Sequence, residues 1–89
     1  MNLDNALIDE LRTKAREGAN VSTLADLIPA HLGQAANSRL MAIAYFHEAF
    51  RLPISELGVL GAWCRYGDGQ LSDEEIEKEL GGGIRKSSV

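Results

Sequence analysis

The residues Cys64–Leu80 read CRYGDGQLSDEEIEKEL, and a turn, a helix start and most of the excess negative charge coincide in this stretch. The triplet Gly67-Asp68-Gly69 indicates a tight turn, because glycine adopts backbone angles that other residues avoid. Ser72 and Glu75 have the spacing of a capping box, in which the serine oxygen accepts from a helix N–H and the glutamate reaches back to the N-cap. We therefore expect a helix to begin near Asp73.

Two helices are expected before this stretch. Pro53–Tyr66, PISELGVLGAWCRY, should form one of them, since proline suits the first turn of a helix. The longest helix is expected over Ala36–Arg51. Its inward stripe would hold residues at helical spacing, namely Leu40, Ile43, Ala44, His47 and Phe50. Because Met41, Tyr45 and Phe46 widen that stripe, this helix is expected at the centre of a bundle.

The first third of the chain predicts two further helices. Leu3–Glu17 places apolar residues at helical spacing among charged ones, and Gly18 suits the position after the helix end. Ser22 and Thr23 precede a second apolar series and are the expected start of its helix. Pro29 lies inside this series, so the helix should bend or restart there.

No segment alternates β-branched and polar residues in the way that a half-buried strand does. The sequence therefore predicts an all-α protein, an irregular bundle of four to five short helices. The triplet Gly81-Gly82-Gly83 should end the last helix. We accordingly expect residues 1–83 to form a single helical domain and residues 84–89 to form a flexible C-terminal tail.

The composition suits one ordinary globular domain: 89 residues, of which 45% are apolar and 25% are charged. The formal net charge of -4 argues against nucleic acid as a partner, since that binding needs clustered lysine and arginine. Between Gly67 and Leu80 the acids meet a single base, Lys78. Such a surface favours a basic protein partner.

Cys64 is the only cysteine, so no intrachain disulfide can form. The start of the chain lacks the charged and apolar segments of a signal peptide. No apolar run approaches the roughly 18 residues that a membrane-spanning helix needs. We expect a cytoplasmic protein without membrane contact, either a monomer or a weak homodimer.

The segment from Asp68 to Glu75 also matches the second half of a calcium-binding EF-hand loop, with Glu75 at its twelfth position. The first and third positions would be Cys64 and Tyr66, which do not supply the carboxylate or amide oxygen that calcium needs. A turn followed by a capped helix accounts for the same residues, and no metal is expected. A degenerate EF-hand-like module that responds to divalent ions is kept as an alternative.

Catalysis would require the fold to bring Cys64 beside His47. Trp63 next to Cys64 favours a buried thiol instead, and the chain lacks a nucleophile elbow, a phosphate loop and a dinucleotide fingerprint. We expect no enzymatic activity and no cofactor.

Leu52–Trp63 has some features of a helix-turn-helix, but its second helix would offer almost no side chains that read bases. A small transcriptional or scaffold adaptor is the second alternative.

The acids around the capping box form a candidate surface for a basic protein. An aromatic anchor, which interfaces favour, would come from Tyr66 or, if it is exposed, from Trp63. The expected partner-binding residues are Tyr66, Asp68, Asp73, Glu74, Glu75 and Glu77. The competing interpretation is a solvated helix face, whose acids suit the positive end of the helix dipole.

The pattern YFHEAFRLPISELGVLGAW…GDGQLSDEEIEKEL, within Tyr45–Leu80 of a short acidic chain, resembles small helical bacterial immunity proteins. Those proteins neutralise toxins of the contact-dependent-inhibition or polymorphic-toxin type. The resemblance implies stoichiometric, tight and non-catalytic binding to a basic toxin domain, often a nuclease. It also implies that acidic side chains cover the toxin's substrate-binding surface.

Overall fold

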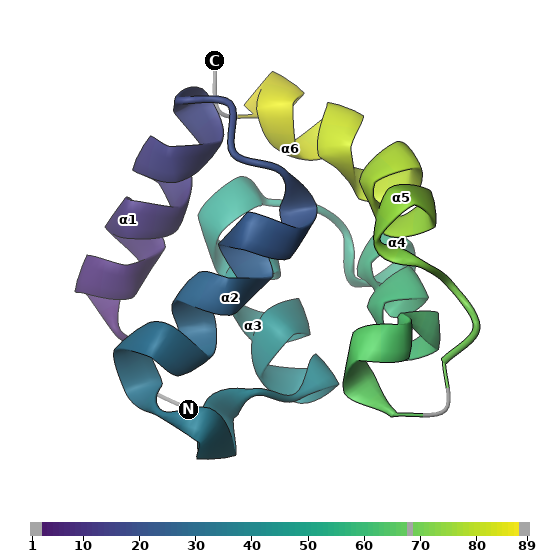
Figure 1. Cartoon of the computed structure of the whole chain (residues 1–89). Coiled ribbons are helices and arrows are strands. Elements are labelled where there is room, and N and C mark those ends of the chain that lie inside the picture. Colours follow the sequence, from purple (N-terminus) through teal and green to yellow (C-terminus); the bar gives the residue numbers. More distant parts are fainter. Residues whose placement is uncertain (1–2, 68, 88–89) are drawn as a thin grey trace.

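The computed structural model describes residues 3–67 and 69–87, and these residues fold into helices and turns without a β-strand. The all-α prediction is confirmed. The three longest helices are α1 (Asn5–Arg16), α2 (Val21–Leu32) and α3 (Arg39–Phe50). α1 and α2 lie side by side, and α3 packs against both of them (Figure 1). Within the described part of the chain, no helix is both long enough and apolar enough to cross a membrane.

Each of these helices has a side-chain cap at its start. The Asp4 carboxylate accepts from the N–H groups of Ala6 and Leu7 in α1. Asn20 caps α2, because its side-chain oxygen accepts from the Thr23 N–H at 2.8 Å. The helix start expected at Ser22 and Thr23 is therefore wrong, since both residues already lie inside the first turn. α2 also runs past Pro29 to Leu32 as one helix and does not restart at the proline.

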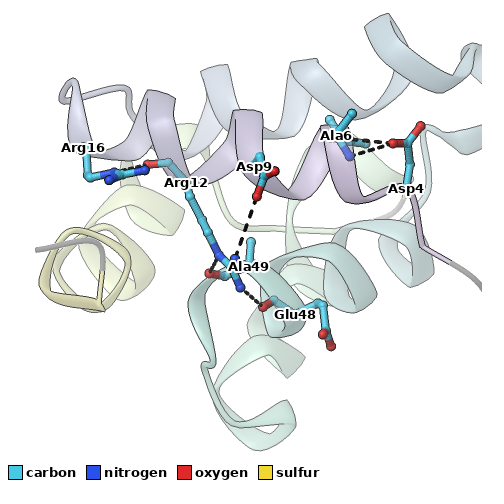
Figure 2. A network of polar contacts seen from close by, with 8 residues as sticks. Asp4, Ala6, Asp9, Arg12, Arg16, Glu48 and Ala49 are labelled. Carbon is cyan, nitrogen blue, oxygen red and sulfur yellow. Dashed lines mark hydrogen bonds and ion pairs between the residues drawn. The ribbon is translucent and has the colours of Figure 1, made fainter.

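An arginine ties the middle of α1 to the end of α3. Arg12 Nε donates to the Ala49 carbonyl at 2.9 Å, and Arg12 Nη2 donates to the Glu48 carbonyl at 3.1 Å. Figure 2 shows the Arg12 side chain reaching across to these two carbonyl groups. The last carbonyls of a helix have no partner inside the helix, and a cation also suits the negative end of its dipole. Arg12 therefore satisfies the end of α3 while it joins two helices.

α3 turns a different face inward from the one expected. Leu40 is 71% exposed and His47 is also exposed, so these two positions of the predicted stripe are wrong, whereas Phe50 and the expected widening by Tyr45 and Phe46 are confirmed. The buried residues of α3 are Ala42, Tyr45, Phe46, Ala49 and Phe50. The helix is apolar around most of its first two turns, so its sequence has few polar positions to mark the solvent side.

The single helix predicted over 53–66 is broken into three pieces. One turn, α4 (Ile54–Leu57), leads into a 3₁₀ turn (Gly58–Ala62), and a second 3₁₀ turn follows at Cys64–Tyr66. Between the two 3₁₀ turns Trp63 has an extended backbone, with φ -72° and ψ 131°. The extended residue turns the indole into the core, where it is fully buried. It also places Cys64 on the surface, so the expected buried thiol is wrong.

The chain after Trp63 returns at Leu71 to the backbone on either side of Trp63. The Leu71 N–H donates to the Ala62 carbonyl at 2.8 Å, and the Cys64 N–H donates to the Leu71 carbonyl at 2.9 Å. Gly69 fits under this closure, because a Cβ there would overlap the carbonyl oxygens of Ala62 and Trp63. The loop is thus pinned on both sides of Trp63.

The last helix continues through the triple glycine. α5 (Asp73–Ile76) passes into a π-helical turn (Glu77–Gly81) and then into α6 (Gly82–Ser87). Gly82 has helical backbone angles, φ -62° and ψ -45°, and Ile84 is 1% exposed. The helix was expected to end at Gly81, and the residues from Ile84 onward were expected to form a tail. Both expectations are wrong, because the chain is helical up to Ser87. The remaining two residues of that tail lie outside the described part of the chain.

Glu77 holds this C-terminal helix against the start of α2. Its Oε1 accepts from the Val21 N–H at 2.7 Å, and its Oε2 accepts from Arg85 Nη1 at 2.7 Å. Gly81 lies beneath the ion pair, where a Cβ would overlap the Glu77 carboxylate. We call this arrangement the Glu77 clamp. It explains why glycine occurs inside a helix in spite of its low helical propensity.

Candidate functional site

The predicted helix start at Asp73 is confirmed together with its capping box. The Glu75 N–H donates to Ser72 Oγ at 3.2 Å, and the Ser72 N–H donates to Glu75 Oε1 at 3.1 Å. The first turn of α5 consequently presents three consecutive acids, Asp73, Glu74 and Glu75, and all three are exposed. None of them forms an ion pair within residues 3–67 and 69–87.

The three acids differ in what they already do for the fold. Asp73 Oδ1 accepts from the indole Nε1 of the buried Trp63 at 2.7 Å. Glu75 uses one oxygen in the capping box. The Glu74 carboxylate has neither a hydrogen bond nor an ion pair to any described residue, so it is the acid of this turn most available to a partner.

Glu77 belongs to the same helix, but both of its oxygens are engaged in the Glu77 clamp. Its side chain is 27% exposed. Glu77 therefore has a structural task that the sequence-based interpretation missed, because its two partners, Val21 and Arg85, are distant in sequence. Asp68, another expected partner-binding residue, lies outside the described residues.

A recess of about 250 Å³ lies between the start of α2 and the start of α5. Its lining residues are Asn20, Ser22, Asp73, Glu74 and Glu77. We call it the acidic recess. Glu77 is already paired with Arg85, whereas Asp73 and Glu74 have no ion pair to a described residue, and these two carboxylates suit a cationic side chain, which would form charge-assisted hydrogen bonds there. The arrangement groups three of the expected partner-binding residues and adds Asn20 and Ser22.

Tyr66 is not among the lining residues of the acidic recess. Its ring packs edge-on against Trp63, with ring centroids 5.6 Å apart. Burial raises the pKa of Tyr66 to about 12, so its phenol stays protonated and can donate a hydrogen bond at neutral pH. Trp63 connects Tyr66 to the acidic recess, since its ring contacts Tyr66 while its Nε1 donates to Asp73. Because Trp63 is fully buried, it cannot itself anchor a partner.

Two further recesses, of about 520 and 340 Å³, meet at Tyr66 and Arg39, which line both. We call their union the Tyr66 groove. The larger recess is also lined by Gly61, Ala62, Gly67, Gly69, Gln70 and Leu71. The smaller one is also lined by Asn37, Ser38, Leu40 and Arg65. Sequence analysis missed this groove, although the glycines clustered around Tyr66 could have indicated a hollow beside that ring.

Arg65 lies between the groove and the acidic recess. Its Nη1 forms an ion pair with Asp26 Oδ1 at 2.6 Å, and its Nη2 donates to the carbonyl of Ser22, a residue of the acidic recess, at 3.4 Å. Its guanidinium carbon lies 4.9 Å from the centroid of the Trp63 ring, which favours a cation–π contact. The two hollows therefore adjoin one another across a fixed arginine.

The alternatives weighed from the sequence were a metal site, a reactive Cys64–His47 pair and a helix-turn-helix. Within the described residues, no group of three His, Cys, Asp or Glu side chains is placed to hold a metal ion. His47 Nδ1 lies 2.8 Å from the Leu52 carbonyl, and no described hydrogen bond joins His47 to the exposed Cys64. The segment that resembled a helix-turn-helix contains one α-helical turn, α4, followed by 3₁₀ structure, which differs from the continuous recognition helix of that motif.

Comparison of the chain with models of protein families, with curated proteins and with solved structures finds no match.

Proposed function

We propose that this protein is a small cytoplasmic binding protein that neutralises a basic bacterial toxin domain by forming a stoichiometric complex with it. The observation that carries the proposal is the acidic recess, in which Asp73 and Glu74 face a hollow without a cation from the described chain. A lysine or arginine of the partner would supply that cation. Nucleases and other enzymes that act on anionic substrates carry such side chains at their substrate-binding surfaces.

The arrangement suits fast association. Charges at a rim steer an oppositely charged partner during encounter, and their effect on affinity is smaller than their effect on the association rate. The fold holds the recess in place before binding, because Asp73 is fixed by Trp63 and Glu77 is fixed by its clamp. A preorganised acceptor loses less conformational entropy on binding than a mobile one.

The test is an affinity capture from the native cells at low and at moderate salt, with three versions of the protein as bait. Glu74→Lys reverses a charge in the acidic recess without removing a described contact. Glu56→Lys makes the same charge change at another exposed helical turn, α4, outside the recess. Glu77 is unsuitable for this test, since its replacement would release the clamp.

We expect the wild-type and Glu56→Lys baits to recover one basic protein in equal amount, and Glu74→Lys to lose most of it. Expression of the recovered protein alone should arrest growth, and co-expression of the wild-type chain should restore it. A capture that yields no basic protein, or one that survives Glu74→Lys unchanged, would remove the support for this function.

A further inference from the structure

Among the described residues, the charged side chains that line the Tyr66 groove are arginines, Arg39 and Arg65. Arg39 lies at the meeting point of its two hollows. The arginine arm runs over Gly61, because a Cβ added at Gly61 would lie 3.9 Å from Arg39 Cδ. A side chain longer than a methyl group at Gly61 would therefore extend toward Arg39 and occupy part of the larger hollow, which both residues line.

Three donors of the groove have no partner among the described residues. The Arg39 guanidinium, the Tyr66 hydroxyl and the Gln70 amide form no hydrogen bond or ion pair with another described residue. In contrast, neighbouring Arg65 is held by Asp26 and by Ser22. A guanidinium offers a planar pair of N–H groups that matches a carboxylate, and a protonated phenol adds one more donor.

Apolar side chains border these donors. Leu40, at the first turn of α3, is 71% exposed and lines the smaller hollow, and the half-buried Leu71 lines the larger one. A large exposed leucine next to free donors favours a ligand that has both apolar and anionic groups. An extended acidic peptide has both, because its side chains can alternate between carboxylate and aliphatic groups along the chain.

We propose that the Tyr66 groove binds an extended acidic segment of a protein, with a carboxylate on Arg39 and an aliphatic side chain against Leu40. Nucleic acid is disfavoured as the occupant, because binding to its phosphate backbone needs clustered lysine and arginine, whereas the described lining of the groove has two arginines and one of them, Arg65, is already paired with Asp26. This surface is additional to the acidic recess, and its ligand has the opposite charge.

The test uses the full chain labelled with ¹⁵N and two short blocked peptides, one alternating glutamate with leucine and one alternating glutamine with leucine. Amide NMR signals are followed during titration with each peptide. We expect the glutamate peptide to shift the signals of residues 38–41, 61–62 and 69–71 in a saturable way. The glutamine peptide should bind at least about tenfold more weakly, since it lacks the charge-assisted bond to Arg39.

Two pairs of variants locate the site. Gly61→Leu fills the groove, whereas Gly58→Leu adds the same side chain in the same 3₁₀ turn where a Cβ meets nothing within 4 Å. Arg39→Glu reverses the charge of the groove, whereas Lys86→Glu reverses an exposed charge outside it. We expect the first member of each pair to weaken binding at least about tenfold and the second to leave it unchanged.

The proposal is overturned if the glutamate peptide shifts no groove signals, if both peptides bind equally, or if Gly61→Leu and Arg39→Glu bind like their controls. It is also overturned if a single-stranded oligonucleotide shifts the groove signals more strongly than the glutamate peptide does. The spectrum of each variant without peptide shows whether it is folded, and if Gly61→Leu is not, the Arg39 pair decides. The result does not depend on the capture experiment, because Glu74 is not part of the groove.

Discussion

Asp73 and Glu74 are neighbours in one helical turn, but the fold uses them differently. Asp73 satisfies the indole N–H of a fully buried tryptophan, whereas Glu74 has no described partner. A buried donor that loses its acceptor costs more than the bond itself contributed, because the donor stays desolvated. Of two adjacent acids, one therefore serves stability first and the other remains available for binding.

We predict that Asp73→Ala lowers the free energy of unfolding by about 1–3 kcal/mol, since it leaves Trp63 Nε1 without its acceptor. Glu74→Ala, the matched change in the same turn, should alter it by less than about 0.5 kcal/mol. Urea denaturation followed by tryptophan fluorescence measures both, and Trp63 is the only tryptophan. Equal stability of the two variants would show that the Trp63–Asp73 bond does not stabilise the fold.

Asp4 gives a prediction about pH. The hydrogen bond from the Leu7 N–H, together with that from Ala6 and the proximity of His31, lowers the pKa of Asp4 below 3.8. A carboxylate whose pKa is lower in the folded state adds stability above the unfolded pKa and loses it as pH falls through the folded pKa. Asp4→Asn retains a good N-cap but does not titrate.

The urea midpoint of the wild type should consequently fall more steeply than that of Asp4→Asn as the pH is lowered from about 5 to about 2. Glu79→Gln, which removes an exposed carboxylate without a hydrogen bond or ion pair to a described residue, serves as a control for the loss of one carboxylate. Parallel pH profiles for the wild type and Asp4→Asn would contradict the assigned cap.

At the scale of elements, the C-terminal helix depends on tertiary contacts. Each helical glycine costs roughly 1 kcal/mol relative to alanine. Burial of Ile84 offsets this cost by about 1.5–3 kcal/mol, and the Glu77 clamp stabilises the helix further. The π-helical turn at Glu77–Gly81 is where the glycines and the clamp coincide.

Two glycine substitutions test this helix. Gly82 is helical and a Cβ there meets nothing within 4 Å, so Gly82→Ala should stabilise the protein by about 0.5–1 kcal/mol. Gly81→Ala should fail to stabilise it, or should destabilise it, because the new Cβ displaces the Glu77 carboxylate from Arg85. Thermal or urea unfolding compares the two. The same gain from both substitutions would contradict the clamp, and no gain from Gly82→Ala would contradict a helix through the triple glycine.

Local signals in the sequence predicted the elements that local contacts determine. The capping box at Ser72 and the glycine after α1 both occur as expected, since each involves neighbours in the chain. The inward face of α3 was predicted only in part, because a helix that is apolar on most sides takes its orientation from what it packs against. The last helix was cut short for a similar reason, as the partners of Glu77 and Ile84 are tertiary.

In the candidate site, too, the features set by neighbours in the chain were predictable and those set by tertiary contacts were not. The three acids of the first turn of α5 could be named from the capping box alone. The sequence did not indicate that Glu77 is held by Val21 and Arg85. Nor did it indicate that Tyr66 and Arg39 line one groove, because Arg39 belongs to α3 and Tyr66 to a 3₁₀ turn far along the chain.

At the scale of the whole molecule, two adjoining hollows are lined by described side chains of opposite charge, carboxylates in one and arginines in the other. The acidic recess and the Tyr66 groove are joined by Arg65, whose ion pair with Asp26 and contact with Ser22 fix the boundary between them. A partner that presents a basic side chain next to an acidic segment would match both hollows in one orientation. Such alternation of charge sets the register of an interface and disfavours partners with a single sign of charge.

If the acidic recess recognises a basic protein, the association rate constant with the captured partner depends on the charge at Glu74 and on salt. It should be measured for the wild type, Glu74→Lys and Glu56→Lys at ionic strengths of about 0.01 M and about 0.15 M, where charges are felt over about 30 Å and about 8 Å. We predict a high rate at low salt that falls at least about tenfold at the higher salt for the wild type and Glu56→Lys. Glu74→Lys should associate more slowly at low salt and respond less to salt. Equal rates for Glu74→Lys and Glu56→Lys at both ionic strengths would contradict the claim.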